Sequence, residues 1–459
     1  MTAAEARPPQ SAGRRLIAVM TGTSVVSAGA ASFAALWATR VLGPTPRGVM
    51  ILAITTAGMV SLLGGLGTGA AFRAQLPLAS PESRERLARA YAWVSVVGSL
   101  VAALVSVGVM LAAAAVITPA LGGAHLLAVV SASTFVQCLT TQGLEAWFAE
   151  GHFQRGSWLT AAAAGLGMGG LMAAGAISRT PTAMIIGDLL FEAAVMLVSV
   201  TWLARERLWV FARPRPGDVR DLVRRGWPSI GVGVGIVLIF RADRYVLGAF
   251  EGAAAVTLYS TAATLAEAAR TIPHQLGQVF IRQVAERGGE VSLRRTVYLA
   301  LAATVATGAV VGVVGWLAIP VVFGRDLRDA RDYLLLLLAA EVLFCPFFVA
   351  SRGLVGGGWT RATGVIGGVG CVAAVAGYLV AVPTLGITGA CIASAVTYLG
   401  LSIATVWALE VRLAERTAHD AGGAPPTLGA AVTGQTAGDA ILAGPNLPAA
   451  ALGDGPLSP

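Results

Sequence analysis

The amino-acid sequence predicts an all-α, polytopic membrane protein with about 12 transmembrane helices, arranged as two six-helix bundles around a central cavity. Three observations lead to this fold. Of the 459 residues, 56% are hydrophobic and only 12% are charged, whereas a soluble domain carries about 25% charged residues. Twelve apolar runs are long enough to cross ~30 Å of hydrocarbon at ~1.5 Å per helical residue. The arginines are concentrated in alternate loops between these runs.

The predicted spans fall into two sets of six. Arg14-Arg15 and the apolar stretch behind them resemble the start of a signal peptide, but the run continues to Val41, so we expect a first membrane-spanning helix. The spans cover approximately residues 15–41, 48–72, 91–118, 124–148, 157–178 and 181–204, and then 227–250, 253–281, 297–322, 333–354, 362–382 and 385–409.

The distribution of positive charge predicts the orientation. All 32 basic residues are arginine. With the N-terminus placed in the cytoplasm, most of them fall in cytoplasmic segments, and the most basic of these is residues 205–225. Since cytoplasmic loops are enriched in positive charge, we expect both termini to be cytoplasmic. The net charge of +8 then reflects topology, and no nucleic-acid partner is expected.

A short repeat supports the division into two halves. Residues 38–43 end the first span, and the similar residues 242–248 end the seventh. Because six spans separate them, the halves have the same orientation and form parallel repeats, as in many transporters. The predicted domains are a cytoplasmic N-terminal segment, a first six-helix bundle, a basic cytoplasmic linker, a second six-helix bundle and a disordered cytoplasmic tail, at residues 1–14, 15–204, 205–226, 227–412 and 413–459.

No motif indicates an enzyme, a cofactor or a metal. Residues 165–170 contain a G-x-G-x-x-G pattern and residues 65–70 nearly do, but both are expected in continuous apolar helices, where glycine permits close helix packing. The four cysteines lie in apolar runs without metal-ligand spacing. We therefore expect neither catalysis nor a bound cofactor.

The seventh span contains three charges within four positions, Arg241, Asp243 and Arg244. Each costs roughly 2.5–3.5 kcal/mol at the centre of a membrane, so such groups must pair or face a polar cavity. Arg241 and Arg244 are three positions apart and share a helix face, whereas Asp243 points elsewhere, towards a neighbouring helix. Two interpretations remain open: an arginine lining that binds an anionic group, or a structural ion pair.

The eighth span repeats this pattern with Glu267 and Arg270, followed by Pro273 and His274. An internal Glu267–Arg270 pair, a kink at Pro273 and a titrating His274 are the expectations here. Further polar groups could line a cavity, carry a coupling proton or pair with the arginines; they are Glu145, Asp188, Glu192 and Glu341, with Gln137, Gln142, Gln275 and Gln278. Asp188 and Glu192 are four positions apart and share one helix face.

Several short motifs lie along the chain. They are Arg241-x-Asp243-x-x-x-Leu247-Gly248, residues 255–260, Ile272-Pro273-x-x-Leu276-Gly277, residues 39–44 with Arg47-Gly48, and residues 382–390 with Ala393. Together they resemble those of the polysaccharide (O-antigen type) flippases of the multidrug/oligosaccharidyl-lipid/polysaccharide exporter superfamily. The resemblance extends from about Arg14 to Leu413 and departs from the family at Thr257, where glycine is frequent.

The resemblance implies transport of an undecaprenyl-diphosphate-linked glycan from the inner to the outer leaflet of the bacterial cell membrane, for polysaccharide or lipopolysaccharide assembly. Arg241, Arg244 and Arg270 are then candidates to bind the diphosphate. Asp243, Glu267, Asp188, Glu192 and Glu341 are candidate cavity acids. Membrane lipids, a glycan polymerase and glycosyltransferases are the implied partners.

Three alternatives stay open. A drug/cation antiporter of the same superfamily would favour acidic pockets, yet the first three spans contain no acidic residue. A peptidoglycan-precursor flippase usually has helices beyond twelve. A scaffold for glycan assembly would need no transport pathway.

Overall fold

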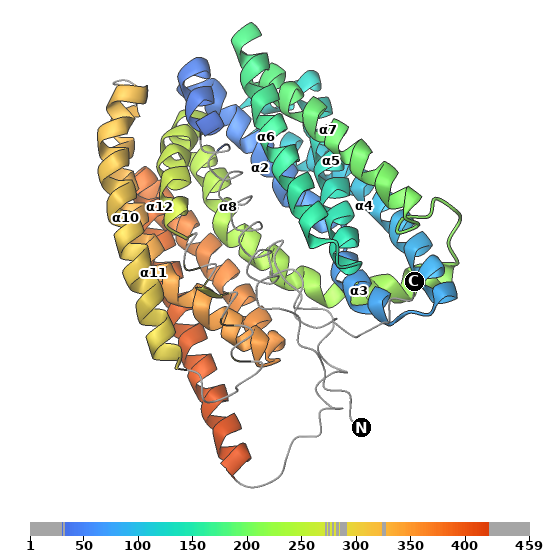
Figure 1. The fold of residues 1–459 in the computed structure, drawn as a ribbon. Coiled ribbons are helices and arrows are strands. Elements are labelled where there is room, and N and C mark those ends of the chain that lie inside the picture. Colours follow the sequence, from blue (N-terminus) through green and yellow to red (C-terminus); the bar gives the residue numbers. More distant parts are fainter. Residues whose placement is uncertain are drawn as a thin grey trace.

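The structure is a computed structural model, and it describes residues 30, 33–270, 273, 276–277, 280, 284, 292–323 and 327–421. Within these residues the chain is all helical (Figure 1). A short helix, Phe33–Leu42, comes first. It is followed by α2 Pro44–Gly64, α3 Thr68–Gln75, η1 Leu76–Leu78, α4 Pro81–Val116, η2 Pro119–Gly122, α5 Ala124–Ala149, α6 Phe153–Ile177, α7 Pro181–Arg205, α8 Pro216–Ala266, η3 Glu267–Arg270, α10 Leu293–Phe323, α11 Ala330–Gly356 and α12 Thr360–Ala421.

Local sequence explains where these helices begin. Ser80 and Thr180 precede α4 and α7, and each side-chain oxygen accepts a hydrogen bond from the backbone N–H three residues later. Pro81 and Pro181 then occupy the first helical turn, where a missing N–H leaves no hydrogen bond unmade.

Glycines divide two very long helices into two segments each. Gly252 has φ 83° inside α8, and Gly386 has φ 59° inside α12. Side chains rarely adopt this left-handed backbone, so both turns require glycine. Nine of the described helices are long and apolar enough to cross a membrane. The turns at Gly252 and Gly386 lie between the predicted spans 7 and 8 and, within a few residues, between spans 11 and 12.

The second predicted span is not one continuous helix, which corrects the expectation for residues 65–70. It is interrupted between α2 and α3, where Leu66 and Gly67 have φ values of 47° and 66°. The expectation is right for residues 165–170, which lie inside α6. There, a Cβ on Gly170 would lie 2.2 Å from the carbonyl oxygen of Gly187. The two glycines allow α6 and α7 to pack with their backbones in contact.

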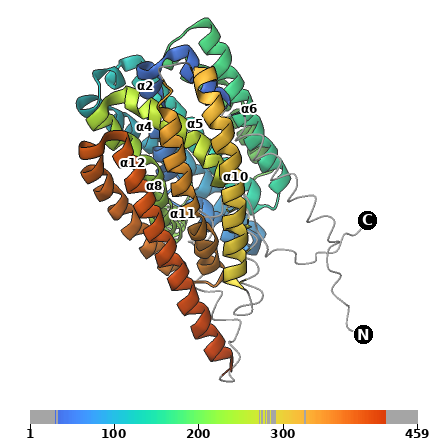
Figure 2. The ribbon, with the colours of Figure 1, turned by 90° about the vertical axis from the view of Figure 1, so that its left-hand side faces the viewer.

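The described helices form two groups (Figures 1 and 2). Helices α2 to α7 pack on one another, α10 to α12 pack on one another, and α8 lies between the groups. Contacts between the halves run from α2, α3 and α4 to α8. Ala253 and Val256 of α8 belong to the buried apolar core of the first half. We keep residues 15–204 and 227–412 as the proposed bounds of the two bundles, with residues 205–226 linking them.

The last helix continues past the predicted start of the tail at residue 413. Helix α12 extends to Ala421 and projects beyond the other helices (Figures 1 and 2). Leu413 packs against the apolar core of the second half, and Arg412 forms an ion pair with Glu415 at 2.9 Å, three positions later. Both contacts favour helix over this stretch. Residues 1–14 and 422–459 lie outside the described residues.

Candidate functional site

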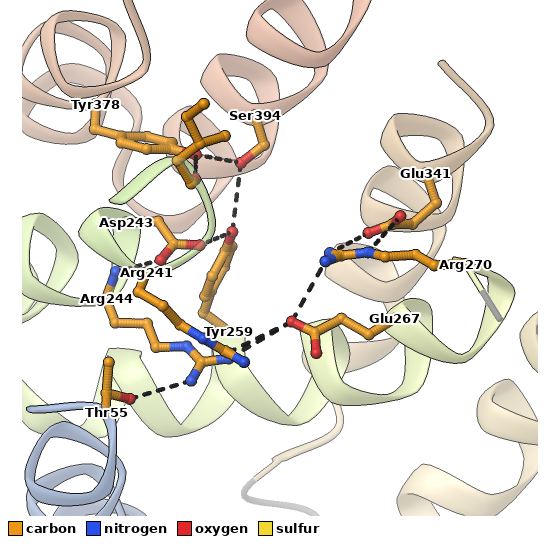
Figure 3. A network of polar contacts seen from close by, with 11 residues as sticks. Thr55, Arg241, Asp243, Arg244, Tyr259, Glu267, Arg270, Glu341, Tyr378 and Ser394 are labelled. Carbon is orange, nitrogen blue, oxygen red and sulfur yellow. Dashed lines mark hydrogen bonds and ion pairs between the residues drawn. The ribbon is translucent and has the colours of Figure 1, made fainter. Parts of the chain in front are cut away.

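Three arginines converge on one carboxylate oxygen where α8 meets η3 (Figure 3). Glu267 Oε1 lies 3.6 Å from Arg241 Nη1, 3.8 Å from Arg244 Nη2 and 3.8 Å from Arg270 Nη2. All three distances exceed those of hydrogen bonds. The expectations that Arg241 and Arg244 share a face, and that Glu267 pairs with Arg270, are both confirmed. The acid therefore balances the cations without holding any of them in a fixed hydrogen bond.

Arg270 is held mainly by a different acid, Glu341 of α11. Arg270 Nε lies 2.7 Å from Glu341 Oε2, and Arg270 Nη2 lies 2.5 Å from Glu341 Oε1. The side chain of Glu341 is only 3% exposed, and the guanidinium carbon of Arg270 lies 4.5 Å from the ring centroid of Phe240. Two parallel hydrogen bonds and an aromatic face fix Arg270 in place. The sequence identified both residues but not their pairing.

Asp243 belongs to a separate polar network inside the second half. Its Oδ2 accepts a hydrogen bond from the Tyr259 hydroxyl at 2.6 Å, and its Oδ1 accepts one from the backbone N–H of Arg244 at 2.7 Å. Ser394 of α12 connects the hydroxyls of Tyr259 and Tyr378 (Figure 3). The expectation that Asp243 points to a neighbouring helix is confirmed. Its contacts join the two segments of α8 on either side of Gly252, and they use both carboxylate oxygens.

Arg244 also connects the two halves. Its Nη1 donates to Thr55 Oγ1 of α2 at 3.2 Å, and the next residue, Tyr245, lies 2.5 Å from Thr56 through its hydroxyl. A cavity of about 100 Å³ lies beside this contact, lined by the helix Phe33–Leu42, α2 and α8. Arg47, which lies between the first and second predicted spans, lines this cavity and is 7% exposed. The sequence contains one signal of this burial, which is the position of Arg47 directly before an apolar run.

The first-half acids do not join this cluster. An Oδ1 atom of Asp188 lies 2.3 Å from where a Cβ on Gly167 would be, so this carboxylate rests on α6. Glu192, one turn further along α7, lies beside Gln137, and Glu145 forms an ion pair with Arg73 at 3.1 Å.

The remaining polar residues expected from the sequence lie away from the arginine cluster or outside the described residues. His274, expected to titrate, and Gln275 and Gln278, expected as polar groups of a cavity lining, lie outside the described part of the chain. Gln142 accepts hydrogen bonds from the Tyr91 hydroxyl inside the first half. Among the described residues, no group of three His, Cys, Asp or Glu side chains is arranged to hold a metal ion.

Two close contacts join the halves near the turn at Gly252. A Cβ on Gly48 of α2 would lie 1.8 Å from the carbonyl oxygen of Ala253. Thr257, the residue at which the sequence departs from the resembled family, donates a hydrogen bond to the carbonyl oxygen of Pro44 at 2.6 Å. The start of α2 thus docks directly on the second segment of α8.

Comparisons with known proteins agree with this architecture. Residues 15–281, more than half of the chain, match the family model described as "Polysaccharide biosynthesis protein". No curated protein matches the sequence.

Solved transporter structures share the fold at low sequence identity. An inward-facing multidrug resistance MATE transporter of the MOP superfamily has a TM-score of 0.66 at 16% identity, covering 84% of this chain and 94% of that one. The lipid II flippase MurJ, in an inward closed conformation, has a TM-score of 0.67 at 12% identity, with coverages of 85% and 87%. A MATE structure in complex with MaL6 has a TM-score of 0.62 at 15% identity, with coverages of 87% and 96%.

Proposed function

Since this chain belongs to the polysaccharide biosynthesis protein family, we propose that it is a flippase that moves a lipid-diphosphate-linked oligosaccharide from the inner to the outer leaflet. The membrane is the bacterial cell membrane, both termini are cytoplasmic, and the glycan is used for surface polysaccharide assembly. An undecaprenyl-diphosphate-linked glycan is the substrate, and a glycan polymerase and glycosyltransferases act beside the transporter.

The observation that carries the proposal is the loose balance of charge around Glu267. Arg241 has a side chain that is 34% exposed, and its only ion pair among the described contacts is the 3.6 Å approach to Glu267. Such a guanidinium can exchange a distant carboxylate for a diphosphate, with which arginine makes two parallel, charge-assisted hydrogen bonds. Glu267 then keeps the three guanidinium groups close together until the diphosphate takes its place.

The structure divides the three candidate arginines by their contacts. Arg270 is fixed by Glu341 and serves as the scaffold of the site. Arg244 contacts Glu267 on one side and Thr55 of the first half on the other. Arg241 is the most exposed of the three and is the first to meet the substrate. In the proposed mechanism Arg241 and Arg244 bind the substrate, and Arg270 positions the site.

Alternating access supplies the mechanism. The headgroup binds between the halves, the lipid tail stays in the bilayer, and rocking of one half against the other carries the headgroup across. Because the halves meet through α2, α3, α4 and α8, α8 both carries Arg241 and Arg244 and forms the moving contact. Binding at the cluster therefore acts directly on the element that must shift.

The test is a flipping assay with a fluorescent lipid-diphosphate oligosaccharide in proteoliposomes. We expect Arg241→Ala to abolish flipping and Arg241→Lys to restore it only in part, because lysine cannot bind two oxygens in a fixed plane. Arg179→Ala, an exposed arginine between α6 and α7, is the matched control.

Two results would overturn the proposal. One is unchanged flipping by Arg241→Ala. The other is efflux of a cationic dye, dependent on Asp188 and Glu192, by a wild-type protein that does not flip the lipid. The second result would assign the chain to the drug antiporters.

A further inference from the structure

The cavity between the halves is lined by two arginines and by no acidic residue. Its lining comes from the helix Phe33–Leu42, from α2 and from the two segments of α8 on either side of Gly252. Two of the lining side chains, Arg47 and Arg244, are cationic, and none is acidic. The remaining polar lining consists of hydroxyl groups, among them that of Ser260.

Three donors at this cavity lack an acceptor within the described residues. They are Arg47 Nε, Arg244 Nε and the hydroxyl of Ser260. The three residues are 7%, 8% and 4% exposed, so bulk water does not satisfy these groups. Arg244 has Glu267 and Thr55 as partners for its other nitrogens, whereas the structure gives Arg47 no ion pair among the described residues. A buried cation of this kind requires an anion, because leaving it unpaired costs a large desolvation energy.

We propose that this cavity binds a single phosphate-sized oxyanion, held by Arg47 from the first half and by Arg244 from the second, with Ser260 as a third donor. The volume of about 100 Å³ is more than the ~10–15 Å³ that a single water needs on this measure, so the cavity has room for one tetrahedral oxyanion. The inference rests on the proposed function in one respect: there, the oxyanion is one phosphoryl group of the lipid diphosphate.

The site also acts on the relative position of the two halves. Arg47 and Arg244 line the same small cavity from opposite sides of the interface, and like charges so placed repel when no anion separates them. The bound oxyanion turns this repulsion into a bridge. The docking of α2 on α8 at Gly48 and Thr257 lies on the same two elements. Occupancy therefore stabilises the arrangement in which the halves are joined here, and departure of the anion releases it.

The experiment is a thermal unfolding titration of the full-length protein in detergent, with inorganic phosphate as one probe and undecaprenyl diphosphate as the other, at constant ionic strength. For the wild type we expect the midpoint to rise by about 2 °C or more at saturation. Arg47→Gln should weaken the apparent affinity about tenfold or more, since it removes a charge-assisted hydrogen bond. Arg40→Gln, an exposed arginine on the preceding helix, should bind like the wild type.

Several outcomes decide between the possibilities. Stabilisation by undecaprenyl diphosphate at lower concentrations than inorganic phosphate supports the headgroup as the ligand, and stabilisation by inorganic phosphate alone supports a free anion. No stabilisation of the wild type by either probe overturns the site, as does equal stabilisation of wild type and Arg47→Gln. If Arg47→Gln fails to fold, Ser260→Ala tests the same cavity, and an unchanged affinity there contradicts the proposal.

Failure of the site and failure of the proposed function are separable. A wild type that flips the lipid-linked glycan but shows no Arg47-dependent phosphate binding retains the function and loses the site. A wild type that binds phosphate through Arg47 but does not flip the glycan retains the site and loses the function.

Discussion

The pair formed by Arg270 and Glu341 is expected to stabilise the second half strongly. Replacing Glu341 with glutamine removes the negative charge that faces two guanidinium nitrogens at 2.5 and 2.7 Å. Glu267 is then the remaining carboxylate near Arg270, at 3.8 Å. Because the Glu341 side chain is 3% exposed, water cannot replace it. Breaking a buried pair of this kind costs about 3–5 kcal/mol.

A double-mutant cycle measures this contribution. The variants are Arg270→Gln, Glu341→Gln and the double replacement, compared by thermal unfolding in detergent. The double variant leaves no unpaired charge at this position, so it should be less destabilised than the sum of the single variants. The expected coupling is about 2–3 kcal/mol, at the upper end of measured values for contacting residues.

Two results would refute the reasoning. A coupling below about 0.5 kcal/mol, the additivity expected of independent sites, would show that the two residues do not depend on each other. Wild-type stability in Glu341→Gln, with complete loss of flipping, would move the pair from a structural to a substrate-binding role.

The remaining predictions concern the partly exposed arginine and the docking of α2 on α8. Arg241→Ala should lower flipping at least tenfold while leaving the unfolding midpoint within about 2 °C of the wild type. Arg241 is partly exposed and its 3.6 Å approach to Glu267 is long, so the pair resembles surface ion pairs, which contribute roughly 0–1 kcal/mol; Arg179→Ala should change neither measurement. Gly48→Ala places a methyl group where only 1.8 Å is available, so it should lower the unfolding midpoint. The matched change Gly58→Ala on the same helix, whose nearest atom is 4.0 Å away, should be tolerated; equal effects would contradict the close approach. Thr257→Val removes one hydrogen bond between the halves, worth about 0.5–1.5 kcal/mol. A cysteine introduced next to this contact, where the folded protein buries it, should therefore react with a thiol reagent about 2–10-fold faster. An unchanged reaction rate would count against the contact.

The main elements of the fold followed from local sequence. Span positions depend on apolar runs of local sequence, so hydropathy was enough to predict most of the helices. The break at residues 65–67 was missed because the apolar run continues through it. Hydropathy does not distinguish a helix from a turn when both are apolar, and only the positive φ values of Leu66 and Gly67 separate α2 from α3.

The candidate site was predicted in composition but not in its pairings. Arg241, Asp243, Arg244, Glu267 and Arg270 drew attention because charge is expensive within a membrane span, and helix periodicity placed Arg241 and Arg244 on one face. Periodicity also placed Asp188 and Glu192 together. It carried no information on whether these acids would reach the arginines, and the structure locates them in the other half.

The sequence by itself determined that the protein is helical, that it crosses the membrane many times and that charge is concentrated where the second half begins. These properties depend on residue type and on spacing along the chain. Only the tertiary structure decided that Arg270 pairs with Glu341, 71 positions away, and that Arg47 turns inward to a cavity shared with Arg244. Electrostatic contacts depend on distance in space, and packing of the two halves brings together charges whose separation in sequence gives no indication that they meet.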